Sequence, residues 1–285
     1  MTLTGMNDNV ASPAKEEPTD VATADQFLRE ISDRRNWPAG MRPDFWFRGH
    51  ANANWELQPA LLRSSFADKA RASMAPRADF DNHLAAVEES INQEFRRTAA
   101  HLIDPAATTL VDIYFQSQHH GLPTRLLDWS TNALAALFFS VSETDQNEID
   151  GMIYAICPNI QIHGRDVTVQ RGAPKGPVYV RHPIVQDEIA RLFGENSSVN
   201  ETPFVLPVLP DSRAGRMLQQ GSCFTLHVRG SQPISSASYR RYRIPMASKE
   251  RIQSDLRIAG ISWATLFPDL DHVALEIRTL RGFGP

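Results

Sequence analysis

The chain is organised around the stretch Tyr114-Phe-Gln-Ser-Gln-His-His-Gly-Leu-Pro-Thr-Arg-Leu-Leu-Asp-Trp-Ser-Thr-Asn-Ala-Leu-Ala-Ala-Leu-Phe-Phe-Ser-Val141. Two apolar stretches with helical spacing flank a polar loop, in which glycine and proline predict an ordered turn. Asp128, followed by Ser130 or Thr131, is predicted to cap the second helix. Loops of this composition often carry function, although a polar helix-turn-helix with caps and one half-buried tryptophan explains the same residues. The polar residues concerned are His119, His120, Thr124, Arg125, Asp128, Trp129 and Ser130.

The composition is that of a protein with a real hydrophobic core. The chain has 285 residues, 42% of them hydrophobic, which suits one large domain with a tail. Its net charge of -4 does not mark the whole surface as a nucleic-acid binder, but net charge can hide a basic groove. With no signal segment and no run of membrane-spanning length, we expect a cytoplasmic protein without membrane contact. Cys157 and Cys223 lie in apolar runs and are expected to be reduced core residues.

The order of apolar patterns predicts the fold class. Residues 1–22 are small, polar and charged, which predicts a disordered tail before one domain at 23–285. Helical spacing is found in several segments, and in the last of these Leu270, Val273 and Ile277 are expected to face inward. Short apolar or alternating runs predict strands at 44–48, 151–157, 204–209, 223–228 and 239–244. This mixture predicts an α+β domain with a central mixed or antiparallel sheet flanked by helices.

Arg48 ends the first of these predicted strands and is followed by Gly49 and His50. An arginine fixed at a strand exit, beside a glycine, can present its guanidinium where a ligand approaches the backbone. Its planar fork suits bidentate binding of phosphate or carboxylate. The alternative is that Arg48 pairs with a carboxylate of the protein and stabilises the sheet edge.

Several kinds of catalytic site find little support in the sequence. There is no Gly-x-Ser-x-Gly elbow, no glycine-rich phosphate loop and no dinucleotide fingerprint. Adjacent histidines in an extended loop point to opposite sides, so we expect no metal site there. A metal-dependent nuclease or hydrolase built on His119, His120 and Asp128 is nevertheless kept as an alternative.

A third polar site precedes the predicted strand at 223–228. The side-chain amides of Gln219 and Gln220 can hydrogen-bond a sugar or amide ligand. The alternative is that they end a surface helix capped by Gly221. Because all three polar sites lie at strand or helix ends, we expect Arg48, the loop at 118–130 and these glutamines to converge on one cleft.

These motifs resemble the FRG domain family, which is named for its Phe-Arg-Gly sequence. The resemblance runs from about residue 25 to the C-terminus, and this chain has Ser130 and Ala133 where the common form has threonine and proline. The matching motifs are Phe47-Arg48-Gly49, the run from Gln118 to Trp129, the run from Asn132 to Phe139, and Arg216-x-x-Gln219-Gln220-Gly221 with Phe224-Thr225.

The order of the motifs is similar to the plan of ADP-ribosyltransferases, and the resemblance implies the following roles. NAD would be held by Arg48, with Asp128 or Ser130 on the nicotinamide side and Gln219 or Gln220 in the third position. No glutamate stands there, and Gln cannot be a general base, so His119 or Asp128 would take that role. The other NAD-binding residues would be Gly49, His50, Thr124, Arg125, Trp129 and Ser130.

The family's members occur in bacteria and phage, often near defence or toxin genes. The resemblance therefore implies an NAD-consuming toxin or defence effector that modifies a protein or nucleic acid, with an antitoxin as a partner. A second hypothesis is a non-catalytic module that binds nucleic acid or another ligand through Arg48, Arg125 and the arginines at 240–243. The metal-dependent hydrolase is the third.

Overall fold

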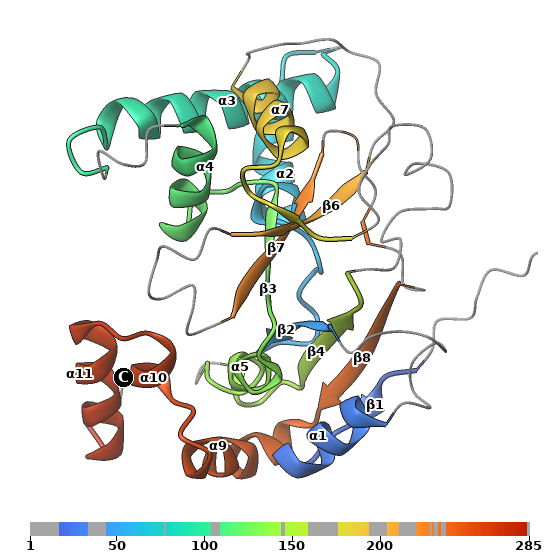
Figure 1. Ribbon diagram of the computed structural model, residues 1–285, viewed down its shortest axis with the longest axis vertical. Coiled ribbons are helices and arrows are strands. Elements are labelled where there is room, and N and C mark those ends of the chain that lie inside the picture. Colours follow the sequence, from blue (N-terminus) through green and yellow to red (C-terminus); the bar gives the residue numbers. More distant parts are fainter. Residues whose placement is uncertain are drawn as a thin grey trace, which may run out of the picture.

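The computed structural model describes residues 17–33, 44–76, 78–103, 109–143, 146–158, 176–193, 204–210, 221–228, 230, 233–234 and 238–283. In this part of the chain an eight-stranded mixed sheet has the order β1-β8-β4-β2-β3-β7-β6-β5 (Figure 1). The pairs β1–β8 and β5–β6 are parallel, and the other neighbours are antiparallel. The strands are β1 (Thr19–Asp20), β2 (Trp46–His50), β3 (Leu126–Ser130), β4 (Gly151–Ile156), β5 (Val178–Tyr179), β6 (Val205–Leu209), β7 (Ser222–His227) and β8 (Tyr239–Ile244).

Helices flank the sheet in two groups. The first group packs with β2, β4 and β8 around Phe47 and Ile153, and the second packs with β3, β6 and β7 around Leu126 and Phe224 (Figure 1). The α+β class with a central mixed sheet is therefore confirmed. The first group consists of α1 (Ala24–Ser32), α5 (Ala133–Phe139), α9 (Lys249–Ile258) and α10 (Trp263–Leu266). The second group consists of α3 (Phe80–Thr98), α4 (Leu110–His119) and α7 (Pro183–Leu192). The other described α-helices are α2 (Ser64–Ala72) and α11 (Leu270–Leu280).

Alternation along the strands sends neighbouring residues to opposite faces of the sheet. On β2, Phe47 joins the core under α5, whereas Trp46 joins a separate apolar cluster with Leu127, Trp129 and other buried residues. Arg48 and His50 share the side of Trp46, because they follow it at intervals of two residues. The functional motif at the end of β2 therefore lies between two apolar layers.

The segment Leu126–Ser130 is a strand, so its prediction as a loop that caps the next helix is wrong. Five residue pairs join β3 to β7, and the leucines and Trp129 are buried, which outweighs the one exposed residue, Asp128. The N-cap of α5 is Asn132, whose Oδ1 accepts hydrogen bonds from the backbone N–H groups of Leu134 at 3.0 Å and Ala135 at 3.3 Å.

Two further features of the sequence prediction need correction. Residues 19–22 of the expected tail are part of the fold, because β1 pairs with β8 and Val21 is fully buried; residues 1–16 lie outside the described residues. In α11, the apolar residues expected to face inward are exposed: Leu270 by 86%, Ile277 by 56% and Val273 by 38%. The apolar pattern predicted the helix but not which side of it packs.

Both cysteines, Cys157 and Cys223, are buried thiols that form no disulfide. None of the described helices has both the length and the apolar character that crossing a membrane requires.

Candidate functional site

The site lies where β2 and β3 separate. The two strands are paired at Phe47 and Ser130, whereas β2 pairs with β4, and β3 with β7, over five positions each. A cleft of about 780 Å³ occupies this fork. Its lining comes from both faces of the sheet and consists of Phe47, Arg48, Gly49, His50, Asn54, Trp55, Glu56, Arg63, Ser64, Ser65, Asp128, Trp129, Ser130, Phe139, Glu143 and Ser222.

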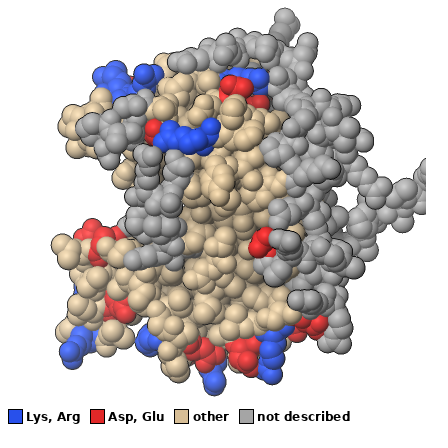
Figure 2. All heavy atoms as spheres, in the orientation of Figure 1, with Lys and Arg blue, Asp and Glu red and all other residues tan. Residues whose placement is uncertain are grey.

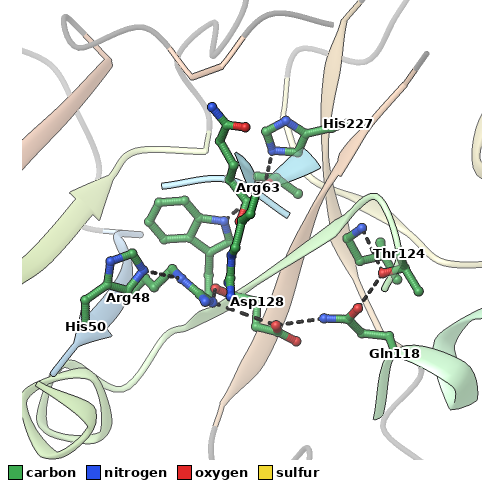
Figure 3. A network of polar contacts seen from close by, with 11 residues as sticks. Arg48, His50, Arg63, Gln118, Thr124, Asp128 and His227 are labelled. Atoms are coloured by element: carbon green, nitrogen blue, oxygen red, sulfur yellow. Dashed lines mark hydrogen bonds and ion pairs between the residues drawn. The ribbon is translucent and has the colours of Figure 1, made fainter. Parts of the chain in front are cut away.

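Arg48 bridges the fork at the bottom of the cleft (Figure 3). Its Nη1 donates to the backbone carbonyl of Asp128 at 2.7 Å, which satisfies an oxygen that the separated β2 backbone does not reach. Its Nε donates to Nε2 of His50 at 2.9 Å, and no described residue accepts from its Nη2. Burial lowers the pKa of Arg48 to about 10, while the charge of Asp128 acts in the opposite direction. Arg48 is therefore a cation at neutral pH, and its guanidinium lines the cleft.

His50 fixes the direction of that guanidinium. Because Nε2 accepts from Arg48, the ring proton lies on Nδ1 and the imidazole is neutral. Burial, followed by the charges of Arg48 and Arg63, lowers the pKa of His50 to about 2. The ring also packs edge-on against Tyr154, with centroids 5.2 Å apart. His50 is thus a positioning group for Arg48 and is unsuited to proton transfer near neutral pH.

The carboxylate of Asp128 is oriented by a chain of hydrogen bonds from α4. Nε2 of Gln118 donates to Oδ2 of Asp128 at 2.8 Å, and Oε1 of the same amide accepts from Oγ1 of Thr124 (Figure 3). The hydroxyl of Thr124 therefore sets which end of the amide faces Asp128. Oδ2 of Asp128 lies 3.7 Å from Nη1 of Arg48, and the side chain is 53% exposed. A held carboxylate and a held guanidinium thus stand side by side in one open cleft.

A second arginine and two acidic residues line the same cleft, and the sequence prediction missed all three. Arg63 precedes α2 and donates from Nε to the carbonyl of Gln58 at 3.1 Å. Glu56 accepts from the backbone N–H of Ser64 at 2.9 Å and from its hydroxyl at 2.7 Å, which lowers the pKa of Glu56. Glu143 follows α5 and is exposed. The serines at 64 and 65 could have signalled a helix start, but the approach of this segment to β2 is not visible in local sequence.

Residues 43–149 match the family model of the FRG domain. The chain contains an FRG domain. No match was found among curated proteins, and none among solved structures. The matched region carries both Arg48 and Asp128, so the cleft lies largely within the FRG domain. The matched region ends before β7, and residues 219 and 220 lie beyond it.

Two of the predicted ligand contacts have structural roles in the FRG domain. Arg125 is buried and donates from Nε to Oε2 of Glu88 at 2.6 Å, so its charge is neutralised away from the cleft. Thr124 is fully buried, and its hydroxyl donates to Gln118 and accepts from the backbone N–H of Leu126 at 3.1 Å. Both were predicted as NAD contacts, and neither side chain lines the cleft. Residue type and spacing could not reveal this, because Glu88 lies 37 positions upstream of Arg125.

The glycine of the Phe-Arg-Gly motif serves helix packing. A Cβ atom at Gly49 would lie 1.9 Å from the backbone oxygen of Ala136, so only glycine allows α5 to approach β2 this closely. Gly49 lines the cleft, but the close neighbour that requires it is α5, and not a ligand as the sequence suggested.

Trp129 and Ser130 both line the cleft of the FRG domain. The indole N–H of Trp129 donates to Oγ1 of Thr225 at 3.0 Å, and that hydroxyl lies 3.2 Å from Nε2 of His227 (Figure 3). Oγ of Ser130 accepts from the backbone N–H of Asn132 at 2.9 Å and so supports the turn into α5.

His119 and His120 do not line the cleft. Both are exposed at the end of α4, and their rings are nearly perpendicular, at 86°. Across the part of the chain that the structure describes, no group of three or more His, Cys, Asp or Glu residues is placed to hold a metal ion. Gln219 and Gln220 lie outside the described residues, while Ser222 just after them lines the cleft.

Proposed function

We propose that the FRG domain binds NAD in this cleft and transfers its ADP-ribose to a protein or nucleic acid. The observation that carries the proposal is the pairing of Arg48 and Asp128 in the fork between β2 and β3. A planar guanidinium suits bidentate binding of a pyrophosphate, and the guanidinium of Arg48 is held in place through Nε and Nη1. Arg63 adds a second positive charge to the same cleft.

Asp128 suits the chemical step of this reaction. In ADP-ribosyl transfer the bond between C1′ of the ribose and the nicotinamide nitrogen breaks, and its electron pair leaves with nicotinamide. The acceptor's nucleophile then bonds to C1′ and loses a proton. A preorganised carboxylate stabilises the positive charge that develops on the ribose, and it can accept the acceptor's proton. Asp128 is favoured over His119 for this role because it lines the cleft and His119 does not.

The nucleic-acid-binding hypothesis has less support. Arg125 is buried, and Arg243 pairs with Asp20 at 2.7 Å. Over the described part of the face in Figure 2, basic and acidic side chains are interspersed and form no continuous basic band. If the protein acts on a nucleic acid, we therefore expect the nucleic acid to be the acceptor of ADP-ribose. We do not expect it to bind across the whole surface.

The decisive experiment is incubation of the purified protein with NAD labelled in its ADP-ribose part, together with a bacterial lysate. We expect release of nicotinamide and transfer of label to a macromolecule, without loss on addition of a chelator. Asp128→Asn should keep an acceptor for Gln118 and retain NAD binding by calorimetry, while the rate of transfer falls about 10²-fold or more. Glu94→Gln, on the exposed side of α3, is the matched control and should behave as wild type.

Arg48→Lys tests the binding step separately. Lysine keeps the charge but has neither the planar fork nor a second nitrogen for His50, so NAD affinity should fall while melting stays near that of wild type. Arg71→Lys, on α2, is the control. A protein that neither binds NAD nor releases nicotinamide would defeat the proposal, and activity lost in chelator would favour the metal-dependent hydrolase.

The resemblance to the FRG family, whose members often occur near defence or toxin genes, suggests the biological setting. An enzyme that consumes NAD and modifies a macromolecule would act in the cytoplasm as a toxin or defence effector, restrained by an antitoxin. Expression of the wild-type protein in bacteria should arrest growth, whereas expression of Asp128→Asn at the same level should not.

A further inference from the structure

The helix α11 carries an apolar stripe that the described chain leaves exposed. Leu270, Val273, Ile277 and Leu280 follow one another at intervals of three and four residues, so they lie along one side of the helix. Their exposed fractions are 86%, 38%, 56% and 57%. In Figure 1, α11 lies with α10 at the edge of the molecule, away from the sheet.

A different side of α11 holds the helix to the protein. Oε2 of Glu276 accepts from the hydroxyl of Ser262 at 2.7 Å and from the backbone N–H of Ala264 at 2.8 Å. The ring of His272 stacks on Phe267, with centroids 4.5 Å apart. Because these contacts fix the rotation of α11, Leu270 and Ile277 are directed outward. Leu280, at the end of the stripe, is also exposed and lines a cavity of about 330 Å³ beside α9 and α10.

We propose that this stripe binds the same stripe of a second copy, with the two α11 helices antiparallel. The spacing of three, four and three residues reads the same in both directions, so the stripe is complementary to itself about a two-fold axis near Leu275. Such an axis places Leu270 opposite Leu280 of the partner subunit, and Val273 opposite Ile277 of the partner subunit.

The charges beside the stripe give a second argument that its partner is another copy of α11, and that the two helices are antiparallel. The row beside the stripe is Asp271, Ala274, Arg278 and Arg281, again at intervals of three, four and three. It is acidic at the N-terminal end and basic at the C-terminal end. An antiparallel two-fold brings the same flank of the two helices together and places Asp271 beside Arg278 and Arg281 of the partner subunit. In a parallel pair this row would instead face the opposite flank, whose Glu276 is already bonded to Ser262 and Ala264. A row of mixed sign also differs from the Lys- and Arg-rich face of helices that lie on membranes.

The test is the mass of the full chain in solution, measured by light scattering and by sedimentation over a concentration series. We expect a dimer, with twice the chain mass of 31.9 kDa. Ile277→Asp should raise the dissociation constant by about tenfold or more, because it places a charge in the apolar contact. Ile258→Asp is the matched control: this isoleucine of α9 is 85% exposed but lies outside the stripe, and its variant should remain dimeric.

Charge reversal tests the antiparallel direction. Asp271→Arg alone should weaken the dimer by about two- to tenfold, and adding Arg278→Asp and Arg281→Asp to it should restore wild-type affinity. A wild-type chain that stays monomeric overturns the proposal, as does equal weakening by the substitutions at 258 and 277. Failure of the combined reversal to restore affinity, or binding of a monomer to phosphatidylcholine vesicles through the stripe, also overturns it. None of these results depends on NAD.

Discussion

The charge of Arg125 is neutralised inside the protein, whereas that of Arg48 faces an open cleft. Oε1 and Oε2 of Glu88 accept from the hydroxyl of Tyr114 at 2.7 Å and from Arg125 at 2.6 Å, and the three side chains form a buried polar cluster under α3 and α4. A buried ion pair of this kind gives little net stability, but loss of one partner leaves an uncompensated charge.

Glu88→Gln should therefore destabilise the protein by about 3–5 kcal/mol, because the guanidinium of Arg125 would stay buried without its counter-ion. Glu94→Gln removes the partner of Arg97 in an exposed pair on the same helix, and it should cost less than about 1 kcal/mol. Urea unfolding of the two variants gives the comparison. Similar losses for both would show that Arg125 finds another partner or solvent when Glu88 is neutral.

His50 predicts a loss of stability on acidification. Its pKa is about 2 in the folded protein, and the unfolded state has the ordinary value of about 6.5, so between these values the unfolded chain binds more protons. The free energy of unfolding should be unaffected by His50 above about pH 6.5 and fall below it, by at most about 1.4 kcal/mol per pH unit. His50→Gln keeps an acceptor for Arg48 and should show a shallower decline between pH 6 and pH 4, roughly the range between those pKa values.

Urea unfolding at several pH values measures this difference. The exposed His120 provides the control, since His120→Gln should follow the wild-type curve. Parallel curves for wild type and His50→Gln would mean that the folded protein accommodates a protonated His50.

At the scale of elements, the contact between β2 and α5 depends on one missing side chain. At Gly49 a new Cβ would meet the backbone oxygen of Ala136 at 1.9 Å, and backbone atoms cannot rotate away. Gly49→Ala should therefore cost about 1–3 kcal/mol or more through overpacking, and it should also weaken NAD binding because Arg48 is the adjacent residue. Thermal melting and calorimetry measure the two effects.

Gly260→Ala separates this effect from ordinary glycine strain. Gly260 has φ of 74° and open space around it, so alanine there should cost only about 1–2 kcal/mol and leave NAD binding unchanged. If both variants lose the same stability and both bind NAD normally, the glycine of the motif is not required for the close approach of α5 to β2.

The elements that sequence predicted well are those whose own residues determine them. The strand Gly151–Ile156 is a continuous apolar run, and Tyr239–Ile244 alternates, so both were found nearly to the residue. The strand Leu126–Ser130 was missed because an aspartate interrupts a short run, and its identity depends on pairing with β7, almost a hundred residues later. The inward side of α11 was assigned wrongly for a related reason: helical spacing shows an apolar side but not what covers it.

The candidate site was predictable only in part, for the same physical reason. Arg48 and Asp128 stand in a distinctive motif at element ends, and the fold brings them together. Arg63 and Glu56 reach the cleft through the path of the chain after β2, which no local pattern encodes. Arg125 has the same residue type as Arg48, but its burial against Glu88 is a property of packing.

At the scale of the whole molecule, the sheet has two halves, and the strands β2 and β3 that border the cleft share a single residue pair. The pair Phe47 and Ser130, the bridge from Arg48 to the Asp128 carbonyl and the apolar cluster that contains Trp46 and Trp129 join them. Each half also has its own helices and its own apolar core. A ligand that contacts β2, the segment at 54–65 and β3 together would tie the halves to each other. This consequence rests on the proposed binding of NAD.

Hydrogen exchange with and without NAD tests this coupling. At a concentration about 100 times its dissociation constant, NAD should raise the free energy of unfolding by about 2.7 kcal/mol. The largest slowing of exchange should fall on both sides of the fork, at residues 48–50 and 128–131, because local opening there exposes backbone that the ligand would bridge. The strand β8, which lies between β1 and β4 and away from the fork, should change little. At the same NAD concentration, Arg48→Lys should show a smaller effect at the same positions. If NAD stabilises the protein without slowing exchange at the fork, or slows exchange in one half only, NAD binds elsewhere. The fork between the two halves would then not be the binding site.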